Sequence, residues 1–278
     1  MVAQNGSNYA EATADKRKIS VVIPAYNKAE VLFSSLQNIL TQLKLETDNF
    51  EIIVVNDGST DSTLEKAISF KKSNGFSDKV KIHNLEKNFG KGHALCFGFG
   101  KSTGDLIIFA DGDLDLPARN FRVALAYLDQ NCADIAIGSK RHPQSSVSYP
   151  VIRRFYSWCY QTLIRFLFNL NVSDTQVGLK VFRREILEKV IPKIIVKAFA
   201  FDLELLVVAK SAGFTKIAEF PTELKHGLGS TINFTAVKNI LVDTFGIFYR
   251  KAILRFYEEK PTQHLQPLLL SKSRNLVS

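Results

Sequence analysis

Carboxylates cluster in one short segment of the chain, directly after the apolar run at residues 106–110. Carboxylate oxygens are hard ligands that suit Mg²⁺ or Mn²⁺. A glycine inside the segment permits a tight turn, which would let two carboxylates address one cation. The segment reads Asp111-Gly112-Asp113-Leu114-Asp115. It is either a divalent-cation site or a solvated acidic turn, and it lacks the downstream ligand spacing of an EF-hand loop.

Two further polar clusters follow apolar runs, at residues 56–61 and 88–93. In the first, Ser59 or Thr60 can cap a helix that Asp61 opens, which explains these three residues as a helix start. This leaves Asp57, whose carboxylate could accept a hydrogen bond from a nucleobase N–H. The second cluster lacks the glycine spacing and the Lys-Ser/Thr pair of a P-loop, but its glycines would let the backbone approach a ribose or a phosphate.

A sheet must position these three clusters. Short apolar runs without alternation predict strands that are covered on both faces. They alternate with helical patterns, which predicts a doubly wound, mostly parallel α/β sheet. Ligands bind such sheets beyond the carboxyl ends of the strands, where all three clusters fall. In this half the predicted strands are 19–23, 51–55, 80–85, 106–110 and 135–138, and the predicted helices are 29–43, 61–74, 91–101 and 117–130.

The pattern changes after about residue 145. An aromatic and basic helix is predicted first, and an amphipathic helix last. Neither is long and apolar enough to span a membrane, because Arg165 interrupts the first and Asp243 and Arg250 the second. The predicted helices are 150–169, 183–190, 201–212 and 234–257, and the predicted strands are 178–182 and 215–221. We expect a disordered tail at 1–18, a catalytic domain at 19–232, an amphipathic helical segment at 233–257 and a tail at 258–278.

Four motifs stand in the order in which they occur in family 2 glycosyltransferases, and the chain resembles that family over about residues 19–230. The motifs are Ile23-Pro24-Ala25-Tyr26-Asn27, Val55-Asn56-Asp57-Gly58-Ser59-Thr60-Asp61, Asn88-Phe89-Gly90-Lys91-Gly92-His93-Ala94 and Asp111-Gly112-Asp113-Leu114-Asp115-Leu116-Pro117. Residues 174–182 and 201–206 look like the branch that glycosylates dolichyl or polyprenyl phosphate. The resemblance implies a Rossmann-like glycosyltransferase type A fold and inversion at the sugar carbon.

The resemblance also implies roles for single residues. Asp113 would bind a metal ion, Mg²⁺ or Mn²⁺, which would neutralise a nucleoside diphosphate, and Asp111 would approach the ribose. Asp115 stands where the family often has Gln or Ser, near the metal or the sugar. The nucleotide-sugar pocket would be lined by Pro24, Ala25, Tyr26, Asp57, Lys91 and Gly92. The first motif departs from the family at Lys28, where Glu is usual.

Basic residues gather in the second half of the chain. Residues 140–197 hold eleven Lys and Arg against three acids, and residues 141–173 hold no acid. Such a surface favours anionic partners, here a lipid phosphate. This phosphate is already nucleophilic near neutral pH, because its second pKa is about 6, so that it needs no general base. The candidates for binding it are Lys140, Arg141, Arg153 and Arg154.

A hydroxyl acceptor would instead need a general base, for which Asp202 and Glu204 are the candidates. They stand two positions apart on a predicted helix and therefore point to nearly opposite sides. Asp202 is alternatively the N-cap of helix 201–212. Asp174 is either a structural turn or a sugar-binding residue. The roles of Gln176, His226 and Ser230 stay open.

We therefore expect a hexosyltransferase that takes glucose or mannose from UDP-glucose or GDP-mannose and transfers it to a polyprenyl (dolichyl-type) phosphate. The second half resembles the glucosyltransferases slightly more. One alternative is a family 2 enzyme that acts on a sugar or another hydroxyl acceptor. Others are a non-catalytic nucleotide-sugar-binding protein and a nucleic-acid-binding protein. The net charge of +9 suggests nucleic acid, but that interpretation leaves residues 111–115 unexplained, so we expect no nucleic-acid partner.

The expected location is the cytoplasm, with peripheral association at the cytoplasmic face of a membrane. The three cysteines have no metal-ligand spacing and fit a reducing compartment as small buried residues. No signal peptide is visible. Residues 234–257 carry two apolar stripes, one of which could pack on the domain while the other enters the membrane interface, helped by nearby Lys and Arg. The alternative is a helix that is buried on two sides or forms a dimer contact. A homo-oligomer is also possible.

Overall fold

The computed structural model describes residues 17–258 except 74, 113–119, 146–150, 199 and 223–233. The side chains of residues 151–155 and 234–236 also lie outside the description. Seven strands are present: β1 (Ile19–Ala25), β2 (Phe50–Asn56), β3 (Val80–Asn84), β4 (Leu106–Phe109), β5 (Ile135–Ser139), β6 (Lys180–Arg183) and β7 (Ile217–Pro221). Eight α-helices and one 3-10 turn accompany them: α1 (Leu32–Glu46), α2 (Thr63–Ser73), α3 (Lys91–Lys101), α4 (Asn120–Gln130), α5 (Val151–Phe168), α6 (Arg184–Val190), η1 (Ile191–Lys193), α7 (Phe201–Ser211) and α8 (Phe234–Ala252).

The strands form one sheet in the order β3-β2-β1-β4-β6-β5-β7. Six strands run in the same direction, and β6 is antiparallel to both of its neighbours, β4 and β5. The prediction of a mostly parallel α/β sheet is therefore confirmed. The reversal of β6 was not predicted, and it matters for the site: Lys180, the first residue of β6, pairs with Phe109, the last residue of β4.

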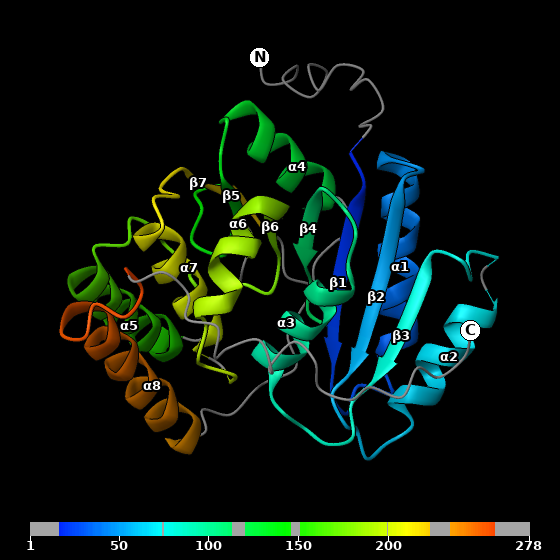
Figure 1. Ribbon diagram of the computed structural model, residues 1–278, viewed down its shortest axis with the longest axis horizontal. Coiled ribbons are helices and arrows are strands. Elements are labelled where there is room, and N and C mark those ends of the chain that lie inside the picture. The colour runs from blue at the N-terminus through cyan, green and yellow to red at the C-terminus, as the bar shows by residue number, and fades with distance from the viewer. Residues whose placement is uncertain are drawn as a thin grey trace.

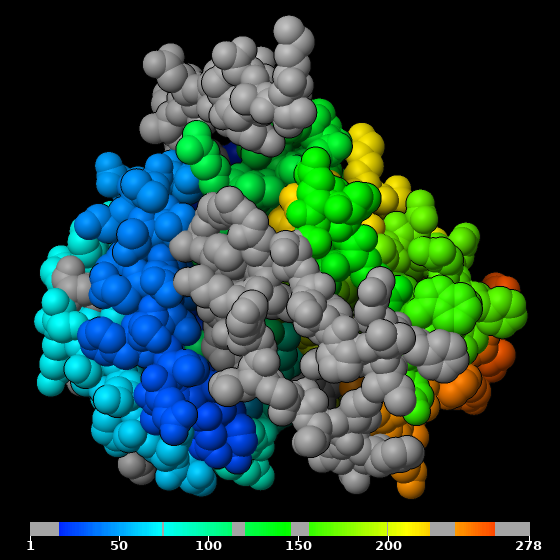
Figure 2. All heavy atoms as spheres, turned by 180° about the vertical axis from the view of Figure 1, so that it is seen from behind, coloured from blue at the N-terminus to red at the C-terminus, as the bar shows by residue number. Residues whose placement is uncertain are grey.

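Helices cover both faces of the sheet, and strands β1, β2, β4, β5 and β6 contribute side chains to two separate cores. Val22, Val55 and Phe109 share one core with α3, α6 and α7. Val21, Val54 and Ile108 share the other with α1, α2 and α4. This two-sided burial explains why the strands are apolar without alternation. Helices α5 and α8 pack beside α7, at the end of the molecule away from β3 (Figure 1), and the rear view shows α8, in orange, far from the blue N-terminal elements (Figure 2).

Some predicted boundaries were wrong. Helix α1 begins at Leu32, not at residue 29, because the N–H groups of residues 27–29 donate to side chains of the loop after β2 and of the first residue of α2. The last helix ends at Ala252 and not at residue 257. The predicted tail 1–18 is held at its end, where the Arg17 side chain bonds the Asp129 carboxylate at 2.6 and 2.9 Å.

Cys132 and Cys159 are exposed, so the expectation of buried cysteines is wrong for these two. Within the described residues, no helix is both long and apolar enough to cross a bilayer.

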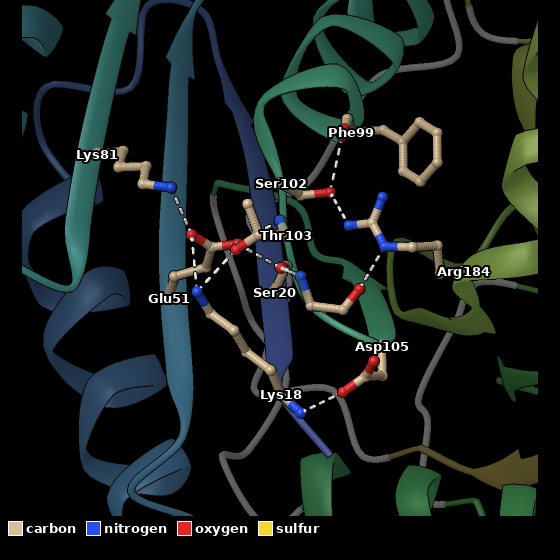
Figure 3. Close-up of polar contacts among 10 residues, drawn as sticks. Lys18, Ser20, Glu51, Lys81, Phe99, Ser102, Thr103, Asp105 and Arg184 are labelled. Carbon is tan, nitrogen blue, oxygen red and sulfur yellow. Dashed lines mark hydrogen bonds and ion pairs between the residues drawn. The ribbon is translucent and has the colours of Figure 1, made fainter.

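A buried carboxylate ties the strands together at the amino end of the sheet, opposite the predicted site (Figure 3). Glu51, only 2% exposed, accepts hydrogen bonds from Ser20 Oγ on β1 and from Lys81 Nζ on β3, both at 2.6 Å. It also accepts the backbone N–H of Thr103, in the α3–β4 connection, at 2.6 Å. Ser20 in turn accepts the N–H of Gly104 at 2.8 Å. One side chain thus joins three strands and the connection that leads into β4.

These contacts control the ionisation of Glu51. Burial by itself raises the pKa of this carboxyl, but the hydrogen bonds from lysine, serine and threonine outweigh it and lower the pKa to about 2. A carboxyl with a depressed folded-state pKa stabilises the fold above its unfolded pKa, and this stabilisation disappears as the pH falls toward the folded value. The relevant window here runs from about pH 4.5 down to about 2.

Replacement of Glu51 by Gln should lower the free energy of unfolding by about 3 kcal/mol at pH 7. The reason is that Lys81 and Lys18, whose Nζ atoms lie 2.6 and 3.6 Å from Glu51 Oε2, lose their buried partner. The deficit relative to the natural protein should shrink as the pH falls from 4.5 toward 2. Denaturant unfolding at several pH values measures both effects. Glu65→Gln, on the exposed side of α2, is the control and should change stability by less than about 0.5 kcal/mol. An equal deficit at pH 7 and pH 3 would contradict the ionic role.

Candidate functional site

The three polar clusters meet at the carboxyl edge of the sheet. Ala25 pairs with Asn56 and Asn56 with Asn84, so that β1, β2 and β3 end side by side. Residue 111 follows two residues after the end of β4, which pairs with β1 on its other side. The predicted convergence of these loops is therefore confirmed for the described residues.

Asp57 connects the first two loops. Its carboxylate accepts the backbone N–H groups of Phe89 and Gly90, each at 2.9 Å, and the side chain is 2% exposed. The sequence did not reveal this contact. Gly90 has a φ of 97°, and a Cβ there would lie 2.5 Å from the Lys197 carbonyl oxygen, so only glycine fits. The main contact of Asp57 thus shapes the loop that leads to Lys91, and its proposed recognition of a nucleobase stays a prediction.

The loop after β1 rests on the loop after β2. Asn27 has a φ of 51°, and its side-chain oxygen accepts the N–H of Thr60 at 2.9 Å. Ser59 Oγ accepts the N–H of Asn27 at 3.0 Å and bonds the Asn56 side chain at 2.5 Å. The prediction that Ser59 or Thr60 caps the helix is therefore wrong: Asp61 accepts the N–H of Thr63, the first residue of α2, at 3.0 Å. Of the predicted pocket residues before this turn, Tyr26 is 42% exposed, Pro24 is half-buried and Ala25 is buried.

A chain of alternating charges runs from the edge into the core. Lys91 Nζ lies 2.8 Å from Asp111 Oδ1 and 3.1 Å from Asp202 Oδ2. On the far side, Lys180 Nζ lies 2.6 Å from Asp202 Oδ1. Burial by itself lowers the pKa of Lys91, but the two carboxylates outweigh it and raise the pKa above its usual value. Burial raises the pKa of Asp202, but the charges of Lys180 and Lys91 outweigh it and lower the pKa, so that Asp202 is ionised and weakly basic.

Glycines allow the backbone to close around Asp111. A Cβ on Gly178 would lie 2.1 Å from Asp111 Oδ2, and a Cβ on Gly112 would lie 2.9 Å from the Pro24 carbonyl oxygen. Gly92 packs against the ring of Phe201, where a Cβ would lie 2.6 Å from a ring carbon. The Asp111 side chain is 35% exposed, so it borders both the packed backbone and solvent.

The structure separates the two candidate bases. Asp202 joins the charged chain, and it is not the N-cap of α7, since Ala200 holds that position without a side-chain hydrogen bond. Glu204 has no exposed surface, and its carboxylate accepts the N–H groups of Ile195 and Val196 at 2.9 and 2.6 Å. It also bonds Arg250 at 3.0 Å and the Tyr257 hydroxyl at 2.5 Å. Glu204 is thus a structural carboxylate that holds the end of α8, and this burial removes it as a catalytic base.

The predicted phosphate-binding residues lie around the end of β5. Lys140 is half-buried, and Arg141 is exposed and donates to Ser157 Oγ on α5 at 2.7 Å. Arg153 and Arg154 lie in the first turn of α5, but their side chains are outside the description. Asp174 accepts the backbone N–H groups of Gln176 at 3.1 Å and Lys140 at 3.4 Å, which favours the structural turn over sugar binding. The side-chain nitrogen of Gln176 is buried and has no hydrogen-bond partner, so its role stays open.

Four predicted residues, Asp113, Asp115, His226 and Ser230, lie outside the described residues. Within the described ranges, no group of three or more metal-ligating side chains is present. Asp111 is the one described carboxylate of the acidic motif, and it offers a partly exposed side chain of the kind that Mg²⁺ and Mn²⁺ prefer. The donor type of Asp111 fits a divalent cation. Binding of the ion by Asp113 stays a prediction, because that residue lies outside the description.

Comparison with known proteins decides the family. The family model "Glycosyl transferase family 2" matches residues 20–191, which is more than half of the chain. The chain belongs to family 2 of the glycosyltransferases. It is 35% identical over 208 residues to the dolichyl-phosphate β-glucosyltransferase of Drosophila melanogaster, and 33% identical over 206 residues to that of Homo sapiens. It is also 32% identical over 216 residues to the glycosyltransferase AglD of Haloferax volcanii.

The alignments cover only part of these relatives. They include 70% of this chain and 63% of the Drosophila and human proteins, and 77% of this chain and 34% of AglD. The chain thus spans less than two thirds of the length of each of these three relatives.

Solved structures share the fold. Glucosyl-3-phosphoglycerate synthase from Mycobacterium tuberculosis, in complex with Mn²⁺, UDP-glucose and phosphoglyceric acid, superposes with a TM-score of 0.63 at 17% identity, covering 85% of this chain and 80% of that one. Mannosyl-3-phosphoglycerate synthase from Rubrobacter xylanophilus gives 0.64 at 17% identity, covering 84% and 74%. The predicted glycosyltransferase type A fold is confirmed.

The structural role of Glu204 can be tested by Glu204→Gln. The amide keeps the shape but removes the buried charge opposite Arg250, so the free energy of unfolding should fall by about 3 kcal/mol. Chemical denaturation at pH 7 measures the change. Glu188→Gln, whose side chain is 57% exposed, is the matched control and should stay within about 0.5 kcal/mol of the natural protein. Equal stabilities for the two variants would show that Glu204 does not hold α8 in place.

Proposed function

We propose that this chain is an inverting hexosyltransferase that moves glucose from UDP-glucose to a polyprenyl phosphate of the dolichyl type. The main support is the similarity to dolichyl-phosphate β-glucosyltransferases at 33% and 35% identity over 70% of the chain. The carboxyl edge of the sheet, where Lys91 and Asp111 meet, is where ligands bind in such sheets. GDP-mannose is the competing donor.

In this reaction, an oxygen of the acceptor phosphate attacks the anomeric carbon of the sugar. A new carbon–oxygen bond forms on one face while the bond to the nucleoside diphosphate breaks on the other, and the diphosphate leaves with the electron pair. A phosphate with a second pKa of about 6 is largely ionised at neutral pH, so no side chain needs to remove a proton. Asp202 supports this mechanism, because a carboxylate held between two ammonium groups is a weak base.

The residues of the edge would bind and orient the donor. Asp57 would hold the loop at residues 88–92 in place, Tyr26 would border the nucleotide, and Asp111 would approach the ribose. A Mg²⁺ or Mn²⁺ ion bound by Asp113, with Asp115 nearby, would neutralise the charge that develops on the leaving diphosphate. Lys140, Arg141, Arg153 and Arg154 would bind the acceptor phosphate as cations.

A membrane surface is the expected source of this acceptor. Helix α8 exposes Val242, Phe245 and Tyr249, at 61%, 52% and 53%, along one stripe at helical spacing. Ile247, of the predicted stripe Ile240, Ile247 and Leu254, is completely buried, whereas Leu254 is 50% exposed, so this stripe packs on the domain only in part. Helix α5 exposes Trp158 at 59% and Phe166 at 85%.

The two helices form one unit. The Tyr160 hydroxyl on α5 lies 3.0 Å from Thr244 Oγ1 on α8, and the rings of Phe168 and Phe248 are 6.2 Å apart. Aromatic and aliphatic side chains with exposed bases beside them, such as Arg165, are typical of helices that lie in a membrane interface. We propose that α5 and α8 dock on the lipid bilayer that holds the acceptor.

One assay matrix tests the activity: purified protein, labelled UDP-glucose or GDP-mannose, polyprenyl phosphate, and Mg²⁺, Mn²⁺ or a chelator. UDP-glucose should label the lipid in the presence of a divalent ion, and the chelator should abolish the labelling. Asp113→Ala should lower turnover at least ~100-fold with unchanged thermal stability, since it removes the proposed metal ligand. Asp78→Ala, an exposed acid, is the control. Labelled lipid from neither donor would overturn the acceptor, and full activity of Asp113→Ala would overturn the metal role.

Sedimentation with phospholipid vesicles that contain anionic lipid tests the membrane surface. The double variant Val242→Ser/Phe245→Ser should bind at least ~10-fold more weakly, because each replacement removes apolar area worth about 1 kcal/mol or more on burial. Leu45→Ser is the matched control, since Leu45 is 73% exposed on α1, which covers the sheet rather than α8, and it should bind like the natural protein. Equal binding of both variants would exclude α8 as the docking surface.

A further inference from the structure

Asp202 is the most enclosed carboxylate of the charged chain at the site. It is 4% exposed, and each of its oxygens faces a different ammonium group: Lys180 at 2.6 Å and Lys91 at 3.1 Å. Lys180 is itself 1% exposed. Buried charges persist only when they are paired, so Asp202 is the partner that lets Lys180 and Lys91 stay charged side by side.

One lysine contacts Asp111 directly, and the other holds backbone that lies against it. Lys91 lies 2.8 Å from Asp111 Oδ1. Lys180 also donates to the Val177 carbonyl oxygen, and the next residue, Gly178, lies so close to Asp111 Oδ2 that a Cβ would be 2.1 Å away. Asp202 thus acts on both oxygens of Asp111. It pairs with Lys91, which contacts Oδ1, and with Lys180, which anchors the backbone beside Oδ2.

We propose that Asp202 is a positioning residue: through Lys91 and Lys180 it holds the Asp111 carboxylate in the orientation in which it receives the donor. This inference rests on the proposed function only for the role of Asp111 in binding a nucleotide-sugar. The buried helix α7 thus carries the residue that orients the partly exposed Asp111.

A charge-balance experiment separates positioning from base catalysis. Asp202→Asn keeps the shape but leaves the buried Lys180 and the partly exposed Lys91 with Asp111 alone. The kcat/KM for the donor should therefore fall at least tenfold, mainly through a higher KM for the donor. The double variant Asp202→Asn/Lys180→Met removes one charge of each sign and should recover to within about threefold of the natural protein. A catalytic base would leave the double variant as inactive as Asp202→Asn. An unchanged donor KM in Asp202→Asn would overturn the positioning role.

Thermal unfolding between pH 6 and pH 9.5 gives a second readout that needs no activity. In Asp202→Asn, Lys180 is still faced by Lys91 and Asp111 but has lost its direct partner, and burial already lowers its pKa. A lysine with a depressed folded-state pKa makes the fold more stable as the pH rises, because the unfolded state binds more protons. The melting temperature of Asp202→Asn should therefore rise with pH relative to the natural protein and to the double variant.

If the melting temperatures of the natural protein, Asp202→Asn and the double variant change with pH in the same way, the pairing of Lys180 with Asp202 is overturned. If the natural protein transfers no sugar to lipid while Asp202→Asn shows the shifted pH curve, the proposed function fails and the buried pairing stands. If the natural protein is active and Asp202→Asn is equally active with the same donor KM, the positioning role fails and the proposed function stands.

Discussion

An ammonium group in a protein interior must find a carboxylate or lose its charge. Beneath the carboxyl edge of this sheet, the buried Lys180 and the partly exposed Lys91 share one carboxylate, Asp202. Lys180 opens the antiparallel strand β6, and Lys91 opens helix α3, so both arrive at the same place from different parts of the chain. The Asp202 carboxylate pairs with both lysines, and Asp111 adds a second negative charge nearer the surface. The reversal of β6 is what brings Lys180 to this edge, since a parallel strand would begin at the opposite one.

Polar networks lie at both the amino and the carboxyl end of the sheet, and their roles differ. At the amino end, Glu51 accepts hydrogen bonds from three connected elements and is fully satisfied (Figure 3). At the carboxyl end, Asp111 keeps a third of its side chain in solvent. A closed network stabilises the strands in register, while the open one leaves a carboxylate available to a ligand. The stabilising network and the proposed binding site thus lie at opposite ends of the same strands.

Helix α7 connects the site with the outer helices. Asp202 and Glu204 stand two residues apart and contact separate sets of partners, as the helical geometry predicts. Asp202 pairs with the lysines of the site, and Glu204 bonds Arg250 in the last turn of α8 and Tyr257, which follows that helix. The surface that exposes Phe245 is therefore attached to the same buried helix as the site. Under the proposed function, in which the acceptor comes from a bilayer, the site and this surface would need such a fixed relation.

The sequence by itself determined the order of strands and helices, the mostly parallel sheet and the convergence of the three polar loops at one edge. These follow from local patterns: apolar runs for strands buried on both faces, and polar clusters where the runs end. The sequence also showed that Asp202 and Glu204 point in opposite directions. It did not determine which of them faces the site.

Tertiary structure alone decided the remaining questions. The direction of β6, the bond from Asp57 to the loop at residues 89–90 and the pairing of Lys180 with Asp202 join residues that are far apart in the chain. No local pattern encodes such a contact, because an aspartate that shapes a loop and one that contacts a ligand have the same side chain. Only the fold decides which oxygens are already occupied by N–H groups or ammonium ions and which remain open to solvent.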